Sequence, residues 1–444
     1  MTAAVNADLS AGSPTDSTAT SAPVGVSRRN VLRALGIGGA AATVPFGLSR
    51  TAASAAVRAA APPARVPTQA KAGTGTFVLL TLYGGNDGLN TVIPYSDGAY
   101  LAGRGALAFN ADQVLKIDDQ WGLNPSLAGI KALWDRKRVA IVRGVGYPNP
   151  NRSHFRSMDI WQSGVPDSYE ATGWLGRWHD ATGADPLRMV NIGASLPRTM
   201  IGTKGGGAAL PNGQLTLPGG AGVSSAFAEL HRGGAGVELG GWGARIGAAG
   251  ADLLRVQQAF GPILTGSVAG VGGTSLEGGA TANGENRTEL DDQFDQVAKL
   301  IKGGAPTRAY GVSLGGFDTH ATERDQHLRL LKAVDQGITR FFAGFEGDVR
   351  GDGVTVLIHS EFGRRVGANS SNGTDHGTAA PVLVIGPSVK GGFYGDAPSL
   401  TDLDQGDLKF TTDFRSIYAT ILSSVLGLDP AAVLGKSFAP IPLL

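Results

Sequence analysis

Five short polar clusters in this 444-residue chain hold side chains that bind divalent cations or activate a nucleophile. Four of them follow short apolar runs, in the stretches YGGNDGLN, PNPNRSHF, GGFDTH and SEFGRR, and the fifth is GTDHG. Carboxylate and imidazole groups that come together from separate segments form sites for Mg²⁺, Mn²⁺ or Zn²⁺. Such an ion polarises the oxygens of an ester and helps to activate the attacking group.

The clusters supply candidates for each part of such a site. The candidate ligands, for one or two metal ions, are Asp87, Asp318, His320, Glu361, Asp375 and His376. Ser153 is the candidate catalytic nucleophile, because it lies between Arg152 and His154. The planar guanidinium of arginine matches two oxygens of a phosphate, so a small anionic ester is the expected substrate. The candidate substrate-binding residues are Arg152, Arg364, Asn90 and His154.

Six short apolar runs predict the buried strands that position these clusters. They cover residues 77–82, 139–144, 187–193, 308–314, 354–359 and 381–386. Amphipathic spacing predicts helices over residues 289–301, from residue 327 onward, and over residues 412–428. Alternating strands and helices indicate an α/β layered domain with a mostly parallel sheet. Because ligands bind beyond the carboxyl ends of such strands, we expect the clusters to meet at one edge of the sheet.

Several of these residues also fit purely structural roles. Asp318 can cap the helix that follows it, and the GGND stretch is typical of a turn. His327 starts a predicted helix and is expected to face solvent. His179 and His231 have no acidic partner in a matching pattern, and His359 lies inside an apolar strand. All three are interpreted as structural histidines.

A competing motif is GVSLG, residues 311–315, which matches the G-x-S-x-G elbow of serine hydrolases. Asp375 and His376 follow it in the matching order. That elbow needs a helix directly after the serine, whereas Ser313 is predicted to lie within a strand. A metal-independent serine esterase that uses Ser313 is therefore the weakest of three functional hypotheses.

Residues 1–55 have the pattern of a twin-arginine signal peptide. Arg28 and Arg29 precede a short Gly/Ala-rich apolar stretch, which ends in an ASA sequence that suits a signal peptidase. We expect export through the twin-arginine machinery to the periplasm, the cell wall or the outside of the cell. We expect no transmembrane segment in the mature chain.

The rest of the chain divides by composition into a linker and one domain. Residues 56–75 predict a flexible linker, and residues 76–444 predict the α/β domain, with a Gly-rich insertion at about 203–288. The insertion is expected to contain at least one helix. The 38 basic and 37 acidic residues give a net charge of +1, which offers no electrostatic reason to expect nucleic acid as a partner. The chain has no cysteine, which excludes disulfides and thiolate metal sites.

Taken together, these stretches resemble domain-of-unknown-function family 1501, an exported family grouped with the alkaline phosphatase/sulfatase-like superfamily. The matching sequences are LLTLYGGNDGLNTVIPY, NRSHF, GGFDTH, HSEFGRRVGANSSNGTDHG and VKGGFYG. The resemblance covers Phe77 to about Leu428, apart from the Gly-rich insertion. It implies an alkaline phosphatase-like three-layer sandwich with a mostly parallel central sheet.

The resemblance also implies a role for each matching residue. Asp87 would be an early metal-binding acid, Ser153 the nucleophile, and Asp318 with His320 a middle pair. Glu361 would be the late acid and His376 the last histidine, with Asp375 sharing that role. Two departures leave open whether one ion or two are bound. The middle pair is separated by one residue, where the superfamily usually has three, and Glu361-Phe362 stands where an Asp-His pair is expected.

The leading hypothesis is an exported metal-dependent hydrolase of phosphate-type esters that uses Zn²⁺, Mn²⁺ or Mg²⁺. Sulfate esters are less expected, because the superfamily's sulfatases use a modified cysteine or serine in a Pro/Arg motif. In PNPNR, proline occupies that nucleophile's position. The alternative is a non-catalytic exported binding protein with a degenerate phosphatase-like site.

Overall fold

The structure is a computed structural model that describes residues 75–211, 220–231, 240–266 and 287–444. The predicted signal peptide and all but the last residue of the predicted linker lie outside the described residues. None of the described helices is both long enough and apolar enough to cross a bilayer.

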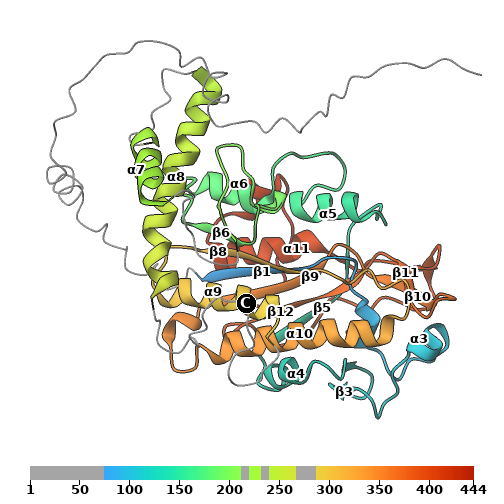
Figure 1. Ribbon diagram of the computed structural model, residues 1–444. Coiled ribbons are helices and arrows are strands. Elements are labelled where there is room, and N and C mark those ends of the chain that lie inside the picture. The colour runs from blue at the N-terminus through green and yellow to red at the C-terminus, as the bar shows by residue number, and fades with distance from the viewer. Residues whose placement is uncertain (1–74, 212–219, 232–239, 267–286) are drawn as a thin grey trace, which may run out of the picture. The chain divides into compact units, whose positions relative to one another are not determined.

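A nine-stranded sheet forms the centre of the fold (Figure 1). Its strands run in the order β13-β5-β12-β9-β1-β8-β6-β7, and β16 also pairs with β5. Their bounds, in that order, are Gly392–Tyr394, Val139–Gly146, Ala380–Ile385, Val354–Ser360, Thr76–Leu82, Ala309–Leu314, Met189–Ile192 and Ala208–Leu210, with β16 at Thr412–Asp413. Only β12 runs antiparallel to its neighbours, β5 and β9, among these described strands. The predicted mostly parallel sheet is confirmed.

Each of the six predicted apolar runs forms a strand of this sheet. The runs are continuously apolar because helices cover both faces of the sheet, so that nearly every residue of β1 and β9 is buried. One difference concerns direction: the run at 381–386 becomes β12, whose antiparallel orientation cannot be read from its composition.

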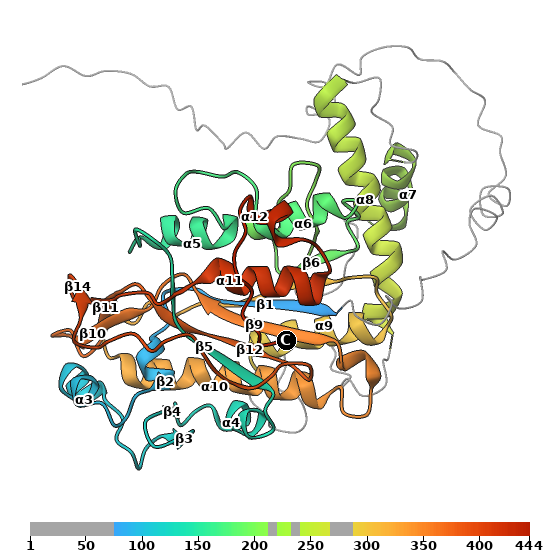
Figure 2. The same cartoon turned by 180° about the vertical axis from the view of Figure 1, so that it is seen from behind.

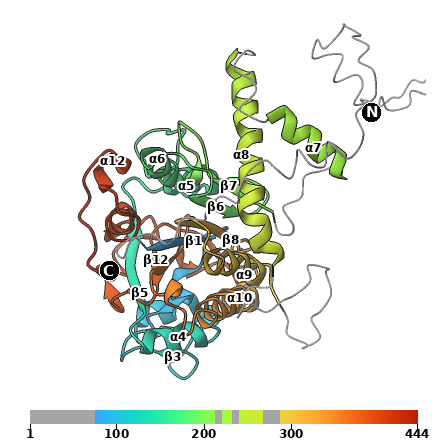
Figure 3. The same cartoon turned by 90° about the vertical axis from the view of Figure 1, so that its left-hand side faces the viewer.

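Helices cover the sheet on both faces and form three layers (Figures 1 and 2). One face carries α4, α9 and α10, which span Ala128–Asp135, Glu289–Lys302 and Glu323–Ala343. The other face carries α5, α6, α11, a π-helix and α12, which span His154–Ser163, Trp174–Ala181, Phe414–Thr420, Ile421–Leu426 and Pro430–Leu434. The end-on view in Figure 3 shows α9 and α10 side by side, and the two helices pack against each other.

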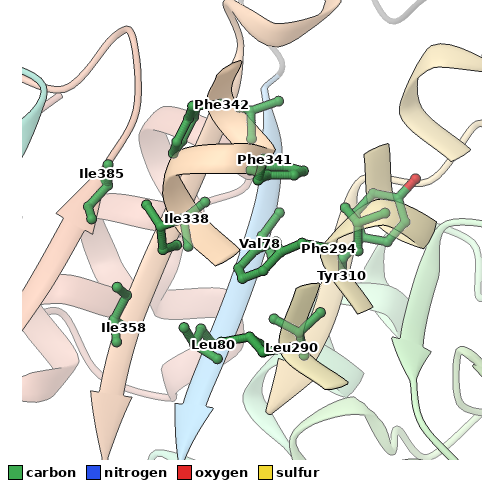
Figure 4. Packing of buried hydrophobic residues seen from close by; sticks show 14 of the residues in the cluster. Val78, Leu80, Leu290, Phe294, Tyr310, Ile338, Phe341, Phe342, Ile358 and Ile385 are labelled. Carbon is green, nitrogen blue, oxygen red and sulfur yellow. The ribbon is translucent and has the colours of Figure 1, made fainter. Parts of the chain in front are cut away.

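Strand β1 supplies apolar side chains to both layers, since successive residues of a strand point to opposite faces. Val78 and Leu80 belong to the core beneath α9 and α10, whereas Phe77 and Leu79 belong to the core beneath α5, α6 and α11. In the first core, Figure 4 shows the strand residues facing side chains of the two helices. The helix residues labelled there are Leu290, Phe294, Ile338, Phe341 and Phe342.

Two helices lie within the predicted Gly-rich insertion, α7 at Gly220–His231 and α8 at Gly240–Thr265. The helix predicted there is therefore present. Val256 and Phe260 of α8 are buried in the same core as α9, so α8 is anchored to the sheet's helical layer. The short edge strand β7 also falls within the predicted insertion.

The remaining elements are short and surround the carboxyl ends of the strands. Helix α3 spans Gly98–Arg104, and the 3-10 helix η1 spans Gly88–Asn90. Two ribbons complete this region: β10–β11, formed by Arg364–Ala368 and Thr374–His376, and β14–β15, formed by Leu403–Asp404 and Asp407–Leu408. A three-stranded sheet is formed by β2, β3 and β4, at Val92–Ile93, Leu115–Lys116 and Gly122–Leu123.

Candidate metal centre

Four polar side chains meet beyond the carboxyl ends of the central strands, and we call them the metal cluster: His154, Asp318, His320 and His376. One ligand atom from each of His154, Asp318 and His376 lies within 4.8 Å of the other two. The Nε2 atoms of His320 and His376 are 2.9 Å apart. The Asp318 Oδ1 atom is 3.0 Å from His320 Nε2 and 3.2 Å from His376 Nε2. Its Oδ2 atom is 3.5 Å from His154 Nε2.

Separate elements bring these residues together. Asp318 and His320 follow β8, His154 is the first residue of α5, and His376 is the last residue of β11. The turns after β1 and β8 approach so closely that a Cβ atom on Gly84 would lie 2.4 Å from the backbone nitrogen of Asp318. Gly84 also has φ +119°, a conformation that side-chain-bearing residues rarely adopt. The Gly-rich turn after β1 is therefore required for Asp318 to occupy its position.

Hydrogen bonds fix the orientation of two imidazole rings. His376 Nδ1 is 2.9 Å from the backbone oxygen of Arg152. A carbonyl oxygen only accepts hydrogen bonds, so Nδ1 carries the proton and Nε2 keeps its lone pair. His154 Nδ1 lies 2.8 Å from Glu361 Oε1 and donates to that carboxylate in the same way. Both Nε2 lone pairs are left directed to Asp318, which is the arrangement of metal-binding histidines held by outer hydrogen bonds.

The donor set fits a divalent cation. His154 Nε2 is buried and has no hydrogen-bond partner among the described residues. A buried polar atom without a partner is costly, and a cation would supply the missing contact. Two imidazole Nε2 atoms and one carboxylate are ligands typical of Zn²⁺, Fe²⁺ and related ions. The side chains of Asp318 and His320 are 47% and 45% exposed, so the site is accessible from solvent.

Electrostatics prepare two of these ligands for binding. Partial burial acts to raise the pKa of Asp318, but the hydrogen bond and positive charge of Arg364 outweigh it and lower that pKa. Burial lowers the pKa of His376, although the Asp318 carboxylate opposes this effect. Near neutral pH, Asp318 is therefore ionised and His376 is neutral, and these are the protonation states that bind metals.

Two further predicted ligands border the metal cluster. Asp375 Oδ1 is 3.5 Å from His320 Nδ1, and a hydrogen bond from Asn369 lowers the pKa of Asp375. Glu361 is buried and lies one step behind the cluster. It accepts hydrogen bonds from His154 and from the Gly84 backbone, at 2.8 and 2.9 Å. In this arrangement Glu361 orients His154.

The other predicted ligand, Asp87, lies in a second group, which we call the buried polar group: Asp87, Arg104, Glu323 and His327. The Asp87 side chain is 0% exposed, and its two oxygens accept hydrogen bonds of 2.6 Å from Arg104. Burial acts to raise the pKa of Asp87, but the Arg104 guanidinium outweighs it and holds that pKa low. The structure thus pairs Asp87 with Arg104 and does not bring it into the metal cluster.

Two predicted substrate-binding residues also have internal partners. Arg364 is buried and donates to the backbone oxygens of Gly84, Gly85, Phe317 and Thr374, and to Asp318 Oδ1 at 2.7 Å. Asn90 is buried, accepts from Tyr100 Oη at 2.7 Å and donates to the Leu107 carbonyl at 3.3 Å. Both residues hold the framework together. Their donors are directed into the protein.

Ser153 and Arg152 remain at the surface beside the metal cluster. Ser153 is exposed and precedes His154, and no described residue forms a hydrogen bond with its hydroxyl. Arg152 contacts His376 through its backbone oxygen, while its side chain forms an ion pair with Asp407. Ser153 therefore lies between two residues that contact the cluster.

One sequence-based expectation about the histidines was wrong. His327 is buried, not solvent-facing, and its Nε2 atom is 2.9 Å from Asn86 Oδ1. His359 is a buried strand residue that contacts Thr81 Oγ1 at 3.2 Å, as expected. Ser313 lies in β8, and its backbone is hydrogen-bonded to the Gln293 side chain. The next helix, α10, begins only at Glu323, so the serine-hydrolase elbow is not formed.

Comparison with protein families gives one match. Residues 300–439 match the model of a family described as "Protein of unknown function (DUF1501)". The predicted resemblance is confirmed for these residues. They include Asp318, His320 and His376 of the metal cluster, whereas His154 lies outside the matched range. A search of curated proteins found no match.

Solved structures that resemble the chain are distant in sequence. One is a protein of the alkaline phosphatase superfamily from Vibrio parahaemolyticus, at 12% identity and a TM-score of 0.37, covering 83% of this chain and 71% of that one. The lipoteichoic acid synthase LtaP from Listeria monocytogenes has 9% identity and a TM-score of 0.36, covering 82% and 76%. The C-terminal periplasmic domain of EcEptC from Escherichia coli has 8% identity and a TM-score of 0.38, covering 83% and 88%. The chemistry of the site is therefore drawn from this chain's own side chains.

Sequence reasoning missed three features of this region. His154 was assigned to the substrate, although its place after a strand next to other ligand candidates is the same signal that identified Asp318. Glu323 and Arg104 were not considered, because nothing in their local sequence indicates that they lie beside Asp87. Arg365 and Asp407, which lie next to Arg152, were also missed.

Proposed function

We propose that this chain binds one divalent transition-metal ion and uses it to hydrolyse phosphate-type esters. The ligands would be His154, Asp318 and His376, with His320 as a fourth donor and Asp375 at the border. The observation that carries the proposal is the pair of Nδ1 hydrogen bonds that turn His154 and His376 toward Asp318. His154 Nε2 also has no hydrogen-bond partner among the described residues, and it faces Asp318 Oδ2 at 3.5 Å.

The donor types favour Zn²⁺ or Mn²⁺ over Mg²⁺. Mg²⁺ prefers oxygen ligands in a regular octahedron, whereas imidazole nitrogen suits zinc and its neighbours in the first transition row. A single ion accounts for the four clustered side chains. Asp87 and Glu361, which a second ion would need, are engaged with Arg104 and His154.

The chain's own groups divide the work of hydrolysis. A bound cation supplies positive charge that stabilises the negative charge developing on the ester oxygens. The Ser153 hydroxyl attacks phosphorus, the bond to the alcohol breaks, and the hydroxyl proton goes to the departing alcohol oxygen. Water then attacks phosphorus and releases phosphate, which restores Ser153. Glu361 and the Arg152 carbonyl hold the two imidazoles in place throughout. Phosphate esters are favoured over sulfate esters.

The first test is metal content together with turnover. The purified full chain should contain close to one equivalent of metal by mass spectrometry, and Asp318→Asn should contain less than about a tenth. Ser153→Ala should keep the metal but lose hydrolysis of aryl phosphates, whereas Ser168→Ala, another exposed serine, should behave like the wild-type chain. Equal metal content in the wild-type chain and Asp318→Asn would exclude this centre.

A specific observation favours a second function, an exported binding protein. Arg364 and Asn90, two of the predicted substrate-binding residues, have partners within the protein. A site with fewer free polar groups could retain an ion and an anion without turnover. One equivalent of metal with no hydrolysis of phosphate or sulfate esters, even after addition of Zn²⁺ or Mn²⁺, would support this function.

We also propose that the chain is exported through the twin-arginine pathway. The support is the Arg28-Arg29 pair ahead of a short apolar stretch. Replacement of both arginines by lysine keeps the charge but should leave the full-length precursor inside the cell. Fractionation and immunoblotting of a bacterial host with this pathway would show this. Equal export of both forms would contradict the assignment.

A further inference from the structure

Beside the metal cluster, two arginines converge on one buried carboxylate. Asp407, on β15, is 2% exposed, and its Oδ2 atom pairs with Nε and Nη2 of Arg152. Its Oδ1 atom is 3.3 Å from Nε of Arg365, on β10. Three separate elements, the start of α5, the β10–β11 ribbon and the β14–β15 ribbon, therefore meet at this carboxylate. We call Arg152 and Arg365 the arginine pair.

The arginine pair lies next to the metal cluster but is distinct from it. The backbone oxygen of Arg152 accepts the hydrogen bond from His376 Nδ1, so the two groups share a boundary. Arg365 follows Arg364 on β10, and successive side chains of a strand point to opposite faces. Arg364 is directed inward to Asp318, and Arg365 is therefore on the other face of the ribbon.

The charges and donors of the arginine pair suit an anion. Two guanidinium groups against the Asp407 carboxylate leave a net charge of +1 on these three residues, and the exposed Asp375 also interacts electrostatically with Arg365. Their side chains are 37% and 36% exposed, so solvent reaches them. Arg365 Nε and Asp407 Oδ1 are buried and have no hydrogen-bond partner among the described residues, so an ion pair at 3.3 Å is what joins Arg365 to Asp407. A guanidinium that is already held by a carboxylate loses little freedom when it binds an oxyanion, and its planar fork matches two oxygens.

We propose that Arg152 and Arg365, held by Asp407, bind a second anionic group of the substrate beside the ester that is hydrolysed at the metal centre. This inference rests on the proposed function and narrows its substrate class to esters that carry another phosphate, sulfate or carboxylate. Asp407 is a positioning residue, since it contacts the arginines and not the substrate.

Phosphate binding tests the two sites separately. Equilibrium dialysis of the full, metal-containing chain against radiolabelled inorganic phosphate should show two phosphates bound per chain at saturation. Arg365→Ala should bind one and keep its metal, and Asp318→Asn, without metal, should also bind one. Arg255→Ala is the matched control, because Arg255, on α8, is 54% exposed and paired with Asp185. It should bind two.

The phosphate counts of the two variants test the arginine pair and the metal centre separately. Two phosphates bound to Arg365→Ala would overturn the arginine pair as an anion site. If Asp318→Asn still bound two phosphates, this would count against the metal centre but not against the arginine pair as an anion site. If Arg365→Ala is poorly folded by circular dichroism, Arg365→Ala/Asp407→Ala removes both partners of the ion pair and serves instead. Arg365→Lys keeps the charge and should retain part of the binding.

Kinetics provide the second readout. Arg365→Ala should raise KM for an aryl phosphate that carries a second phosphate by about 10- to 100-fold, the effect of losing a charge-assisted hydrogen bond. It should raise KM far more than it lowers kcat, because the arginine pair does not contact the reacting atoms. The increase of KM should be much smaller for a singly charged aryl phosphate, which lacks the group that Arg365 binds. Equal increases of KM for both esters would refute a separate second position.

Discussion

The metal cluster and the buried polar group both contain an aspartate and at least one histidine, but they differ in how deeply they are buried and in how the aspartate is paired. In the buried polar group, Asp87 is paired with Arg104 and the residues are almost fully buried. In the metal cluster, the carboxylate and imidazoles are partly exposed, and His154 Nε2 lacks a partner. The bidentate Asp87–Arg104 pair gives a rigid support inside the protein, whereas the solvent-accessible carboxylate and imidazoles of the metal cluster leave a position for an added ion. Residue type alone does not distinguish the two.

The two groups are physically connected. The Thr374 hydroxyl donates to Glu323 Oε2 at 2.6 Å, and Thr374 lies on β11 two residues before His376. Asp318 and Glu323 flank the same loop between β8 and α10. The buried polar group therefore fixes two of the three segments that carry candidate metal ligands. Changes in it should affect stability first, while changes at the metal cluster should affect metal affinity first.

The largest effect is expected for Asp87→Asn. It leaves Arg104 buried beside a neutral group, and breaking a buried ion pair on one side costs about 3–5 kcal/mol. Urea unfolding should show this loss, while the chains that remain folded should still bind metal. The control is Asp402→Asn in the exposed pair with Lys409, which should change stability little. If Asp87→Asn lost metal without losing stability, Asp87 would belong to the metal centre.

The next largest effect is the loss of stability that protonation of His327 should cause at acid pH. Burial lowers the pKa of His327 to about 4, and the charged groups facing it are Asp87, Arg104 and Arg364. Between about pH 6.5 and pH 4 the unfolded chain binds a proton that the folded chain does not. The stability that His327 contributes is therefore present above pH 6.5 and is lost as pH falls through 4, by roughly 3 kcal/mol.

His327→Gln is the matched variant, because it removes the titrating group and keeps a polar side chain for Asn86. The difference in unfolding free energy between the wild-type chain and this variant should depend on pH in that range. A difference that is independent of pH would show that His327 is not buried in its neutral form.

A smaller effect, on metal affinity, is expected at Glu361, which accepts a hydrogen bond from the candidate ligand His154. Glu361→Gln keeps an acceptor for His154 Nδ1 but removes the charge, which weakens the hold on that imidazole. Loss of such an outer contact lowers metal affinity by about 10- to 100-fold. Competition with a fluorescent chelator would measure it, and Glu346→Gln, at an exposed position, is the control. Complete loss of metal would instead identify Glu361 as a direct ligand.

Glu323→Gln is expected to cause no loss of stability at neutral pH. Burial and the adjacent Asp87 raise the pKa of Glu323 to about 9, so it is already uncharged at pH 7. The folded chain holds a proton that the unfolded chain loses above about pH 4.5, so stability from Glu323 is full below that pH and is lost as pH rises through 9. Gln removes this dependence, and thermal unfolding from pH 5 to 9 should show a flatter profile. Destabilisation at pH 7 comparable to that of Asp87→Asn would mean that Glu323 is charged.

The sequence predicted the central sheet and the edge of it at which the polar clusters lie, because both follow from local patterns. Continuous apolar runs mark strands covered on both faces, and parallel strands deliver their following residues to one edge. Asp318, His320 and His376 were found in this way. The antiparallel direction of β12 was not predictable, since a reversed strand has the same composition.

Local sequence patterns do not show which charged side chains contact each other in the folded chain. Asp87 looked like Asp318 in sequence, and only the position of Arg104, on a short helix without clear periodicity, separates them. His327 was mistaken for a surface residue, although it precedes Leu331 by four positions and so shares the buried face of α10. Arg365 and Asp407 lie on short strands whose partners are far along the chain.

The hydrogen bonds of Arg364 bear on whether the chain folds before or after it binds an ion. One guanidinium joins the turn after β1, the turn after β8 and strand β11, which are far apart along the chain. No nascent segment holds enough of these pieces to capture an ion early. If the proposed metal centre and the proposed twin-arginine export both hold, the ion would bind after folding and therefore in the compartment where the chain is made.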